Sequence, residues 1–221
     1  QLLATNTRLS FLPYQLMTFD IDVKNKKYDQ SDHVDDLNNN RDFGKAASLA
    51  LFDYLRKSKT KGYTLSLSGG ADSSSIAVLV AEMVKNGVQE LGWVKFLESL
   101  NLKTDWRNDI EEKEAIKKIV NKILITAYQG TKNSSEETLT SARSLAESIG
   151  AQFKQWEIDD VVNHNHEIIA QAIDRKLTWE EDDIAMQNIQ ARTRSPLIWM
   201  MANITGTILL TTSNRSEGDV G

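Results

Sequence analysis

The chain of 221 residues has no cysteine, no excess of basic residues and no long hydrophobic run. Without cysteine there is no disulfide framework, no thiolate chemistry and no cysteine metal site, which fits a reducing cytosol. The formal net charge is −5 and no lysine or arginine cluster stands out, which argues against a nucleic-acid surface. No apolar run approaches the roughly 18 residues of a membrane span, and no basic-then-apolar leader opens the chain. We therefore expect a soluble, cytoplasmic protein that binds neither nucleic acid nor membrane.

The two ends of the sequence predict a piece of a longer polypeptide. The chain opens on Gln1 without a methionine and stops at Gly221, shortly after a polar cluster. Residues 24–42 are rich in Asp, Asn and Lys and have almost no apolar side chain, which is typical of a linker or exposed loop. We therefore expect residues 1–42 to be the tail of a preceding domain with its linker. Residues 43–221 would then form one domain, truncated at its C-terminal end.

Short apolar runs alternate with amphipathic segments along the chain. The runs have the length and composition of buried strands, and they cover residues 63–67, 123–127, 153–158 and 207–212. Most of the segments between them have helical periodicity. Strands that alternate with helices predict an α/β fold, a doubly wound parallel sheet with helices on both faces. In such a sheet, ligands bind beyond the carboxyl ends of the strands.

Three local signals predict where helices end, begin or break. Gly87, with the asparagine before it, is expected to end the helix that follows the first strand, because glycine adopts a left-handed terminus without strain. Ser134 precedes a glutamate by the spacing of a capping box and so predicts the start of another helix. Pro196 should kink or split the long helical pattern of residues 183–206, because proline has no backbone N–H to donate.

The stretch Ser66–Ser75 joins the first predicted strand to the next helix and has the composition of a phosphate cradle. Gly69 and Gly70 allow the backbone to approach an anion, and the following helix offers unpaired N–H groups at its positive end. The surrounding serines add hydroxyl groups: Ser68, Ser73, Ser74 and Ser75. The lysine of the commoner G-x-x-x-x-G-K-[ST] loop is missing. We interpret the stretch as a cradle for the pyrophosphate of ATP.

Asp72 places a carboxylate in this cradle. A carboxylate would repel a polyphosphate unless a cation lay between them, so the loop implies Mg²⁺. Glu217, which follows a later strand, is available to complete the metal site. The alternative is a Gly-Gly turn that binds no ligand, with Asp72 as the cap of the helix.

Polar clusters begin where three of the predicted strands end: residues 68–75, 129–135 and 211–217. Because the carboxyl ends of parallel strands lie at one edge of a sheet, these clusters should gather there. Any such fold needs loops at this edge, so plain connections remain the alternative. Arg192 and Arg194 lie two apart on a helix and cannot point to the same side. One could clamp a phosphate or carboxylate while the other faces solvent.

At these residues the sequence resembles the synthetase portion of NAD⁺ synthetases, members of the N-type ATP pyrophosphatase superfamily. Residues 68–73 resemble the pyrophosphate loop of the whole superfamily. Three narrower motifs are similar to those of NAD⁺ synthetases, above all the glutamine-dependent, long-chain form: residues 128–137, 188–192 and 211–217. The resemblance identifies residues 43–221 as an ATP pyrophosphatase-type synthetase domain with an adenine nucleotide alpha hydrolase-like fold. Residues 11–23 resemble the tail of a nitrilase-type glutaminase domain.

The resemblance implies a ligase that forms a C–N bond. The nicotinate carboxylate of deamido-NAD⁺ would attack the α-phosphate of ATP, pyrophosphate would leave, and ammonia would capture the adenylate to give NAD⁺ and AMP. It also implies Mg²⁺ and, in the full-length chain, a glutaminase domain that makes the ammonia from glutamine. We also expect a homo-oligomer. Two rival functions remain: a GMP-synthetase-like amidotransferase, and an ATP-binding module without catalysis.

The same resemblance implies roles for individual residues. ATP would be bound by Ser68, Gly69, Gly70, Asp72, Ser73, Ser74, Gly130, Thr131 and Thr212. Mg²⁺ would be held by Asp72 and Glu217. Catalysis would depend on Asp72, Glu217 and Arg192. The substrate would be bound by Arg192, Arg194 and Asn214. No nucleophilic side chain is required, because the substrate carboxylate and ammonia supply the nucleophiles.

Overall fold

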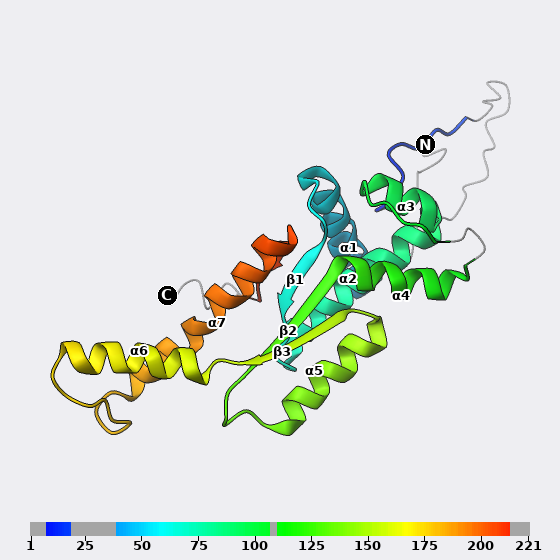
Figure 1. The fold of residues 1–221 in the computed structure, drawn as a ribbon. Helices are drawn as coiled ribbons and strands as arrows, with labels where there is room; N and C mark the ends of the chain where they lie inside the picture. The colour runs from blue at the N-terminus through cyan, green and yellow to red at the C-terminus, as the bar shows by residue number, and fades with distance from the viewer. Residues whose placement is uncertain (1–7, 19–38, 107–109, 213–221) are drawn as a thin grey trace.

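A four-stranded parallel sheet lies at the centre of the computed structural model, which describes residues 8–18, 39–106 and 110–212 (Figure 1). Across the sheet the strands follow the order β3-β2-β1-β4. The strands are β1 (Tyr63–Ser66), β2 (Leu124–Gly130), β3 (Gln152–Glu157) and β4 (Ile208–Leu210). The helices of the described residues are α1 (Asn39–Ser58), α2 (Ala71–Leu91), α3 (Trp93–Ser99), α4 (Glu112–Ile123), α5 (Glu136–Ile149), α6 (Asp159–Ala172) and α7 (Asp183–Thr205).

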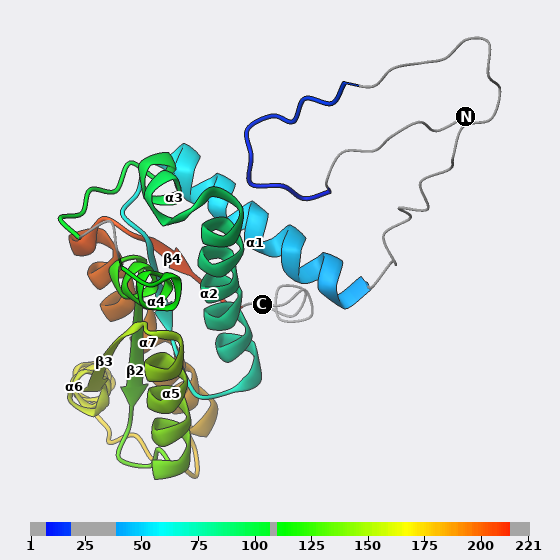
Figure 2. The same cartoon turned by 90° about the vertical axis from the view of Figure 1, so that its right-hand side faces the viewer.

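Helices cover both faces of the sheet. On one face α2 and α5 contact the strands, and α1, α3 and α4 pack against α2 (Figures 1 and 2). On the other face α7 contacts β1 and β4, and α6 packs against α7. The predicted doubly wound α/β fold is therefore confirmed. No helix in the described part of the chain is long and apolar enough to cross a membrane.

β1 is an interior strand of the sheet and is buried on both sides. Tyr63 pairs with Leu124 of β2 on one side and with Ile208 of β4 on the other. Leu65, at the middle of β1, is completely buried. Burial of this kind explains the apolar composition by which the strand was predicted. Because β2 and β3 lie on one side of β1 and β4 on the other, the chain reverses its direction of winding at β1, where doubly wound sheets bind their ligands.

α2 continues past Gly87 to Leu91, so its predicted end at Gly87 is wrong. Gly87 is buried, and a Cβ atom at this position would lie 2.3 Å from a ring carbon of Phe96. The glycine therefore allows α3 to approach α2 closely and does not end the helix. The helix ends instead at Gly92, which has the positive φ of 78° that glycine tolerates.

Two further helix predictions are corrected. Ser135, not Ser134, caps α5, since the Ser135 hydroxyl accepts a hydrogen bond from the Thr138 N–H at 3.3 Å. Ser134 instead accepts a hydrogen bond from the Thr131 N–H at 2.8 Å. Pro196 does not split α7, which runs as one helix through it. Pro196 is exposed, so water can bond the carbonyl group that the proline ring leaves unpaired.

Phe11 anchors residues 8–18 to helices α1 and α2. Its side chain is 6% exposed, and its ring centroid lies 5.0 Å from that of Phe52 on α1. The Phe11 N–H donates to the carboxylate of Glu90 on α2 at 2.9 Å, and the Ser10 hydroxyl donates to the same carboxylate. One buried ring and one shared acceptor therefore hold this segment at the C-terminal end of α2.

We expect Phe11→Ala to release this segment. Truncating a buried phenylalanine typically costs about 3–5 kcal/mol, and most of that cost would fall on a short segment with few other contacts. Limited proteolysis followed by mass spectrometry should show at least about ten-fold faster cleavage within residues 8–18, since about 1.4 kcal/mol corresponds to a factor of ten. The control is Leu12→Ala, because Leu12 is 44% exposed. Equal cleavage rates in the two variants would contradict the anchoring role of Phe11.

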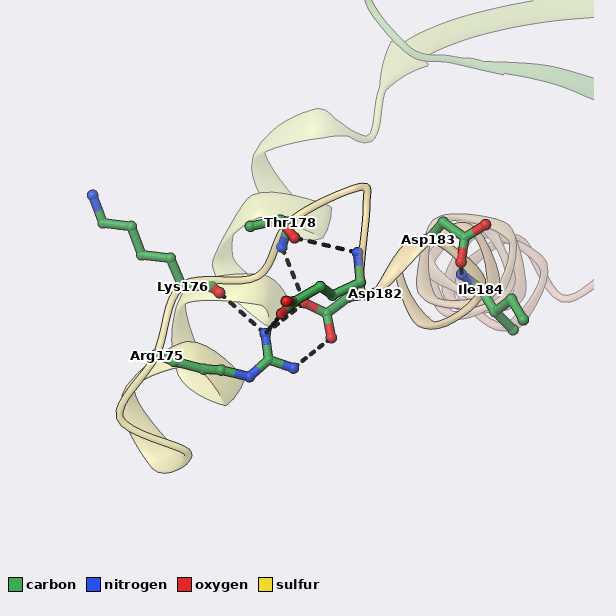
Figure 3. A network of polar contacts seen from close by, with 7 residues as sticks. Arg175, Lys176, Thr178, Asp182, Asp183 and Ile184 are labelled. Carbon is green, nitrogen blue, oxygen red and sulfur yellow. Dashed lines mark hydrogen bonds and ion pairs between the residues drawn. The ribbon is translucent and has the colours of Figure 1, made fainter.

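A bidentate ion pair closes the connection between α6 and α7 (Figure 3). The guanidinium nitrogens of Arg175 donate to the two carboxylate oxygens of Asp182 at 2.7 and 2.6 Å. The Thr178 N–H donates to the same carboxylate at 3.0 Å. These hydrogen bonds, above all those from Arg175, lower the pKa of Asp182 to about 2, and Asp182 in turn raises the pKa of Arg175.

This ion pair predicts an acid-sensitive connection. Because the folded pKa of Asp182 is depressed, its stabilising contribution is complete above about pH 4 and is lost as the pH falls towards about 2. Titration of the Asp182 carboxyl carbon by NMR should give a midpoint near 2 in the wild type. In Arg175→Gln the midpoint should rise towards the ordinary 3.8. An unchanged midpoint in that variant would contradict the assignment of the shift to Arg175.

Candidate active site

The loop after β1 turns into α2 at two glycines. Gly69 has a φ of 83°, and a Cβ atom there would lie 2.4 Å from the carbonyl oxygen of Thr138 on α5. Gly70 is the N-cap of α2 and provides no side-chain capping hydrogen bond. The N–H groups of the first turn of α2 are therefore not covered by a capping side chain. Such a helix terminus favours an anion.

Two serines brace this loop from within. Ser73 is 4% exposed, and its hydroxyl donates to the Gly70 carbonyl oxygen at 3.3 Å. The same hydroxyl oxygen accepts the Ser68 N–H at 3.2 Å and lies 3.1 Å from the Ser68 hydroxyl. The Gly70 N–H donates to the Ser68 hydroxyl at 3.3 Å. The Ser73 hydroxyl therefore shapes the loop, and its predicted contact with ATP stays a prediction.

Asp72 lies in the first turn of α2 and is exposed. Gly70 occupies the N-cap, so the alternative in which Asp72 caps the helix is wrong. The Ser74 N–H donates to the Gly70 carbonyl oxygen at 3.1 Å, which is the first hydrogen bond of the helix. Within the described ranges no group of three His, Cys, Asp or Glu side chains could hold a metal ion. Glu217, the predicted second metal ligand, lies outside the described residues.

The carboxyl end of β2 lies directly beside this loop. Leu67, which follows β1, donates its N–H to the Ala127 carbonyl oxygen at 2.9 Å. The Gln129 side-chain NH₂ donates to the Ser66 hydroxyl at 3.1 Å. Gly130 is buried, and a Cβ atom there would lie 3.1 Å from the Tyr128 ring. The polar clusters after β1 and β2 therefore meet at one edge of the sheet, as their positions in the sequence predicted.

The third polar cluster is only partly described. Thr211 is exposed and Thr212 is half-buried, and both directly follow β4. Because β4 is parallel to β1 and pairs with it, these threonines begin at the same edge of the sheet. The predicted substrate ligand Asn214 lies outside the described residues, as does Glu217.

A cavity of about 380 Å³ opens at this edge. Its lining residues come from the ends of β1 and β2, the phosphate loop, the loop before α5, and α5 and α7: Ser66, Ser68, Tyr128, Gln129, Ser134, Thr138 and Arg194. Arg194 is half-buried, and its Nε–H donates to the Gln129 carbonyl oxygen at 3.3 Å. Arg192 is exposed and is not among the lining residues. The structure therefore brings Arg194 to the cavity, and the predicted role of Arg192 stays a prediction.

Five lining residues were not among the predicted site residues: Ser66, Tyr128, Gln129, Ser134 and Thr138. A signal was present for Gln129, because an amide side chain is unusual in a strand whose residues are all buried. No sequence signal marks Thr138. It reaches the cavity only because α5 packs behind the phosphate loop, where the Tyr128 hydroxyl lies 2.8 Å from the Thr138 hydroxyl.

A larger hollow, of about 540 Å³, lies beside α4 and is lined by Trp106, Lys117 and Lys122, among others. These lysines are exposed, and the hollow lies away from the carboxyl ends of the strands. The 380 Å³ cavity is smaller but collects polar groups from β1, β2, α5, α7 and the phosphate loop. Convergent polar groups of this kind are what mark a binding site.

Comparison with known proteins identifies the family of the chain. Residues 45–221 match the family model described as NAD synthase. The chain belongs to the NAD synthase family. It is 33% identical over 161 residues to a glutamine-dependent NAD(+) synthetase of Oryza sativa subsp. indica, an alignment that covers 70% of this chain and 22% of that protein. The predicted family is therefore confirmed, and the chain spans about a fifth of the length of this curated relative.

Two solved structures share the fold. The crystal structure of a glutamine-dependent NAD(+) synthetase from Cytophaga hutchinsonii is 52% identical, with a TM-score of 0.78, and the match covers 82% of this chain and 32% of that one. The glutamine-dependent NAD+ synthetase from Acinetobacter baumannii, solved with ADP, is 21% identical, with a TM-score of 0.58. That match covers 82% of this chain and 27% of the other, and it shows the fold alone.

Proposed function

We propose that this NAD synthase domain binds ATP at the carboxyl edge of its sheet and uses it to convert a carboxylate into an amide. One observation carries the proposal. Ser68 of the phosphate loop and Arg194 of α7 line one cavity that is large enough for part of a nucleotide, and the uncapped start of α2 follows Ser68 within three residues. Each of these features favours an anion, and their combination suits a triphosphate.

The triphosphate would lie along the phosphate loop. The first-turn N–H groups of α2, with the Ser68 and Ser74 hydroxyls, would hold the β- and γ-phosphates, which leave together as pyrophosphate. Gly130, Thr131 and Thr212 would contact the rest of the nucleotide. The glutamine-dependent NAD+ synthetase from Acinetobacter baumannii was solved with ADP, which is in keeping with an adenine nucleotide as a ligand of this chain.

Asp72 fits a metal site in this cradle. Its exposed carboxylate lies at the start of α2. Without a cation between them, this carboxylate would repel a polyphosphate bound there. Asp72 and Glu217 would hold Mg²⁺, which would neutralise part of the charge of the leaving pyrophosphate. The fit rests on the donor chemistry of these two carboxylates.

The reaction needs positioning more than side-chain chemistry. A carboxylate oxygen of deamido-NAD⁺ would attack the α-phosphorus of ATP, and the bond from that phosphorus to the β-phosphate would break. Ammonia would then attack the acyl carbon and lose a proton, and AMP would leave, giving NAD⁺. The guanidinium of Arg194 supplies a fixed positive charge in the cavity wall, where it can oppose the phosphate or the substrate carboxylate. Arg192 and Asn214 would add further substrate contacts.

The remainder of the protein would supply the ammonia. Residues 1–42 would be the tail of a glutaminase domain with its linker, and residues 43–221 the synthetase domain, truncated at its C-terminal end. Glutamine would then be the source of the ammonia in the full-length protein. We also propose a homo-oligomer, in keeping with the exposed apolar side chains on α7, among them Trp199 (61%) and Ile204 (77%).

An assay of the intact protein tests this function. With ATP, Mg²⁺, ammonia and deamido-NAD⁺, we expect AMP and NAD⁺ in equal amounts. AMP formation with xanthosine monophosphate but not with deamido-NAD⁺ would favour a GMP-synthetase-like amidotransferase. ATP binding without AMP from either acceptor would favour a binding module without catalysis.

A further inference from the structure

Gln129 is a buried polar residue in an otherwise apolar strand. It is the penultimate residue of β2 and is 6% exposed, yet it lines the cavity at the sheet edge. Its backbone carbonyl oxygen accepts the Arg194 Nε–H at 3.3 Å. Its backbone also belongs to the ladder with β3, where it pairs with Trp156. The position of this residue is therefore fixed from two sides.

One end of the Gln129 carboxamide is bonded and the other is not. The NH₂ group donates to the Ser66 hydroxyl at 3.1 Å, and this hydrogen bond holds the side chain at the carboxyl end of β1. The carbonyl oxygen Oε1 is buried and has no hydrogen-bond partner among the described residues. Buried polar atoms in native proteins are nearly always bonded to protein, water or ligand. An unbonded buried acceptor on a residue that lines a cavity therefore indicates a ligand that donates a hydrogen bond.

The neighbours of Gln129 limit what that ligand group can be. Ser66 lies two residues before Ser68 at the start of the phosphate loop, so Oε1 is close to the expected position of the phosphates. The ionised triphosphate has no hydrogen to donate. The donors of ATP are the 6-amino group of adenine and the two ribose hydroxyls. An acceptor at this place therefore suits the adenosine part of the nucleotide.

We propose that Gln129 is a specificity-determining residue that accepts a hydrogen bond from the adenosine part of ATP through its carboxamide oxygen. The proposal rests on the ATP site proposed above. Because Ser66 and the strand backbone hold the amide in place before the ligand arrives, little ordering is needed on binding. A nucleotide that lacks the donor would leave the buried oxygen unpaired, which is how polar sites reject analogues. A nucleotide with an acceptor at that place would be repelled.

Four nucleotides and one substitution test this role. Dissociation constants are measured by calorimetry on the intact protein for ATP, inosine triphosphate, 2′-deoxy-ATP and 3′-deoxy-ATP. The wild type should bind one of the three analogues about ten-fold more weakly than ATP, the factor expected for one neutral hydrogen bond. Weak binding of inosine triphosphate would identify the amino group as the donor, and weak binding of a deoxy analogue would identify the ribose hydroxyl. Gln129→Met, which keeps the length but removes the acceptor, should bind ATP about ten-fold more weakly and lose this discrimination.

Gln152→Met is the matched control. Gln152 is half-buried at the start of β3, at the opposite edge of the sheet, and its NH₂ group donates to the Asn121 carbonyl oxygen at 2.8 Å. The same substitution there should leave all four affinity ratios unchanged. If the wild type binds all four nucleotides equally, or if Gln129→Met weakens them all by one factor, the role of Gln129 is overturned and the ATP site stands. If the wild type binds no ATP, the proposed function fails and the role of Gln129 fails with it.

Discussion

Gly69→Ala is expected to lower AMP formation at least about a hundredfold, because displacing a catalytic constellation by about 1 Å can cost that much. The added Cβ atom would lie 2.4 Å from the Thr138 carbonyl oxygen, a backbone atom of α5 that cannot turn away. The backbone at Gly69 also has a φ of 83°, which disfavours any residue with a side chain. The loop must therefore shift, and the pyrophosphate would lose its place at the start of α2. Calorimetric binding of ATP and the initial rate of AMP release measure the effect.

Another glycine provides the control. Gly92 has a φ of 78° but no atom within 4 Å of an added Cβ, so Gly92→Ala introduces the backbone strain without the clash. The Gly92→Ala variant should keep ATP binding far better than Gly69→Ala. Similar affinities for ATP in the Gly69→Ala and Gly92→Ala variants would show that the close contact with α5 does not shape the site.

Asp72→Asn is expected to lower the Mg²⁺-dependent rate of AMP formation by about a hundredfold or more, a loss of the size seen when one transition-state electrostatic contact is removed. The variant should fold normally. Asp72 is exposed, and its loss should cost only about 0.3–1 kcal/mol of favourable interaction with the start of α2. The rate is measured as a function of Mg²⁺ concentration, and the half-saturating concentration should rise along with the loss of rate.

Asp53→Asn is the charge-matched control for this experiment. Asp53 lies on α1, where its carboxylate accepts hydrogen bonds from Lys57 and Arg56, and these lower its pKa. The substitution changes the net charge by the same amount but lies outside the cavity. It should leave the Mg²⁺ dependence unchanged. Wild-type activity of Asp72→Asn at limiting Mg²⁺ would exclude the bridging role of Asp72.

Much of the fold was predictable because a strand that is buried on both faces must consist mainly of apolar residues. β1 and β2 are buried on both faces, so each is a short apolar run that stands out from the amphipathic helices around it. The phosphate loop was predictable for a different reason. Gly69 must tolerate both a positive φ and a close backbone contact, and that requirement leaves a local trace in the sequence.

The remaining features depend on contacts between distant elements. Gly87 predicted a helix end, but its role is to make room on α2 for the ring of Phe96 from α3. Sequence periodicity does not reveal that α3 packs there. The spacing of Arg192 and Arg194 showed only that one of them could point inward. Which one does so is set by the rotation of α7 against β1 and β4, and the structure brings Arg194 to the cavity. Thr138 reaches the site only through the docking of α5.

The most direct test is a crystal structure of the protein with an ATP analogue that cannot be cleaved between the α- and β-phosphates. The β- and γ-phosphates should lie against the first turn of α2 beside Gly69 and Gly70, with the adenosine towards Gln129 and Thr131. A triphosphate bound elsewhere, for example in the 540 Å³ hollow beside Lys117 and Lys122, would contradict the assignment of the sheet edge as the ATP site.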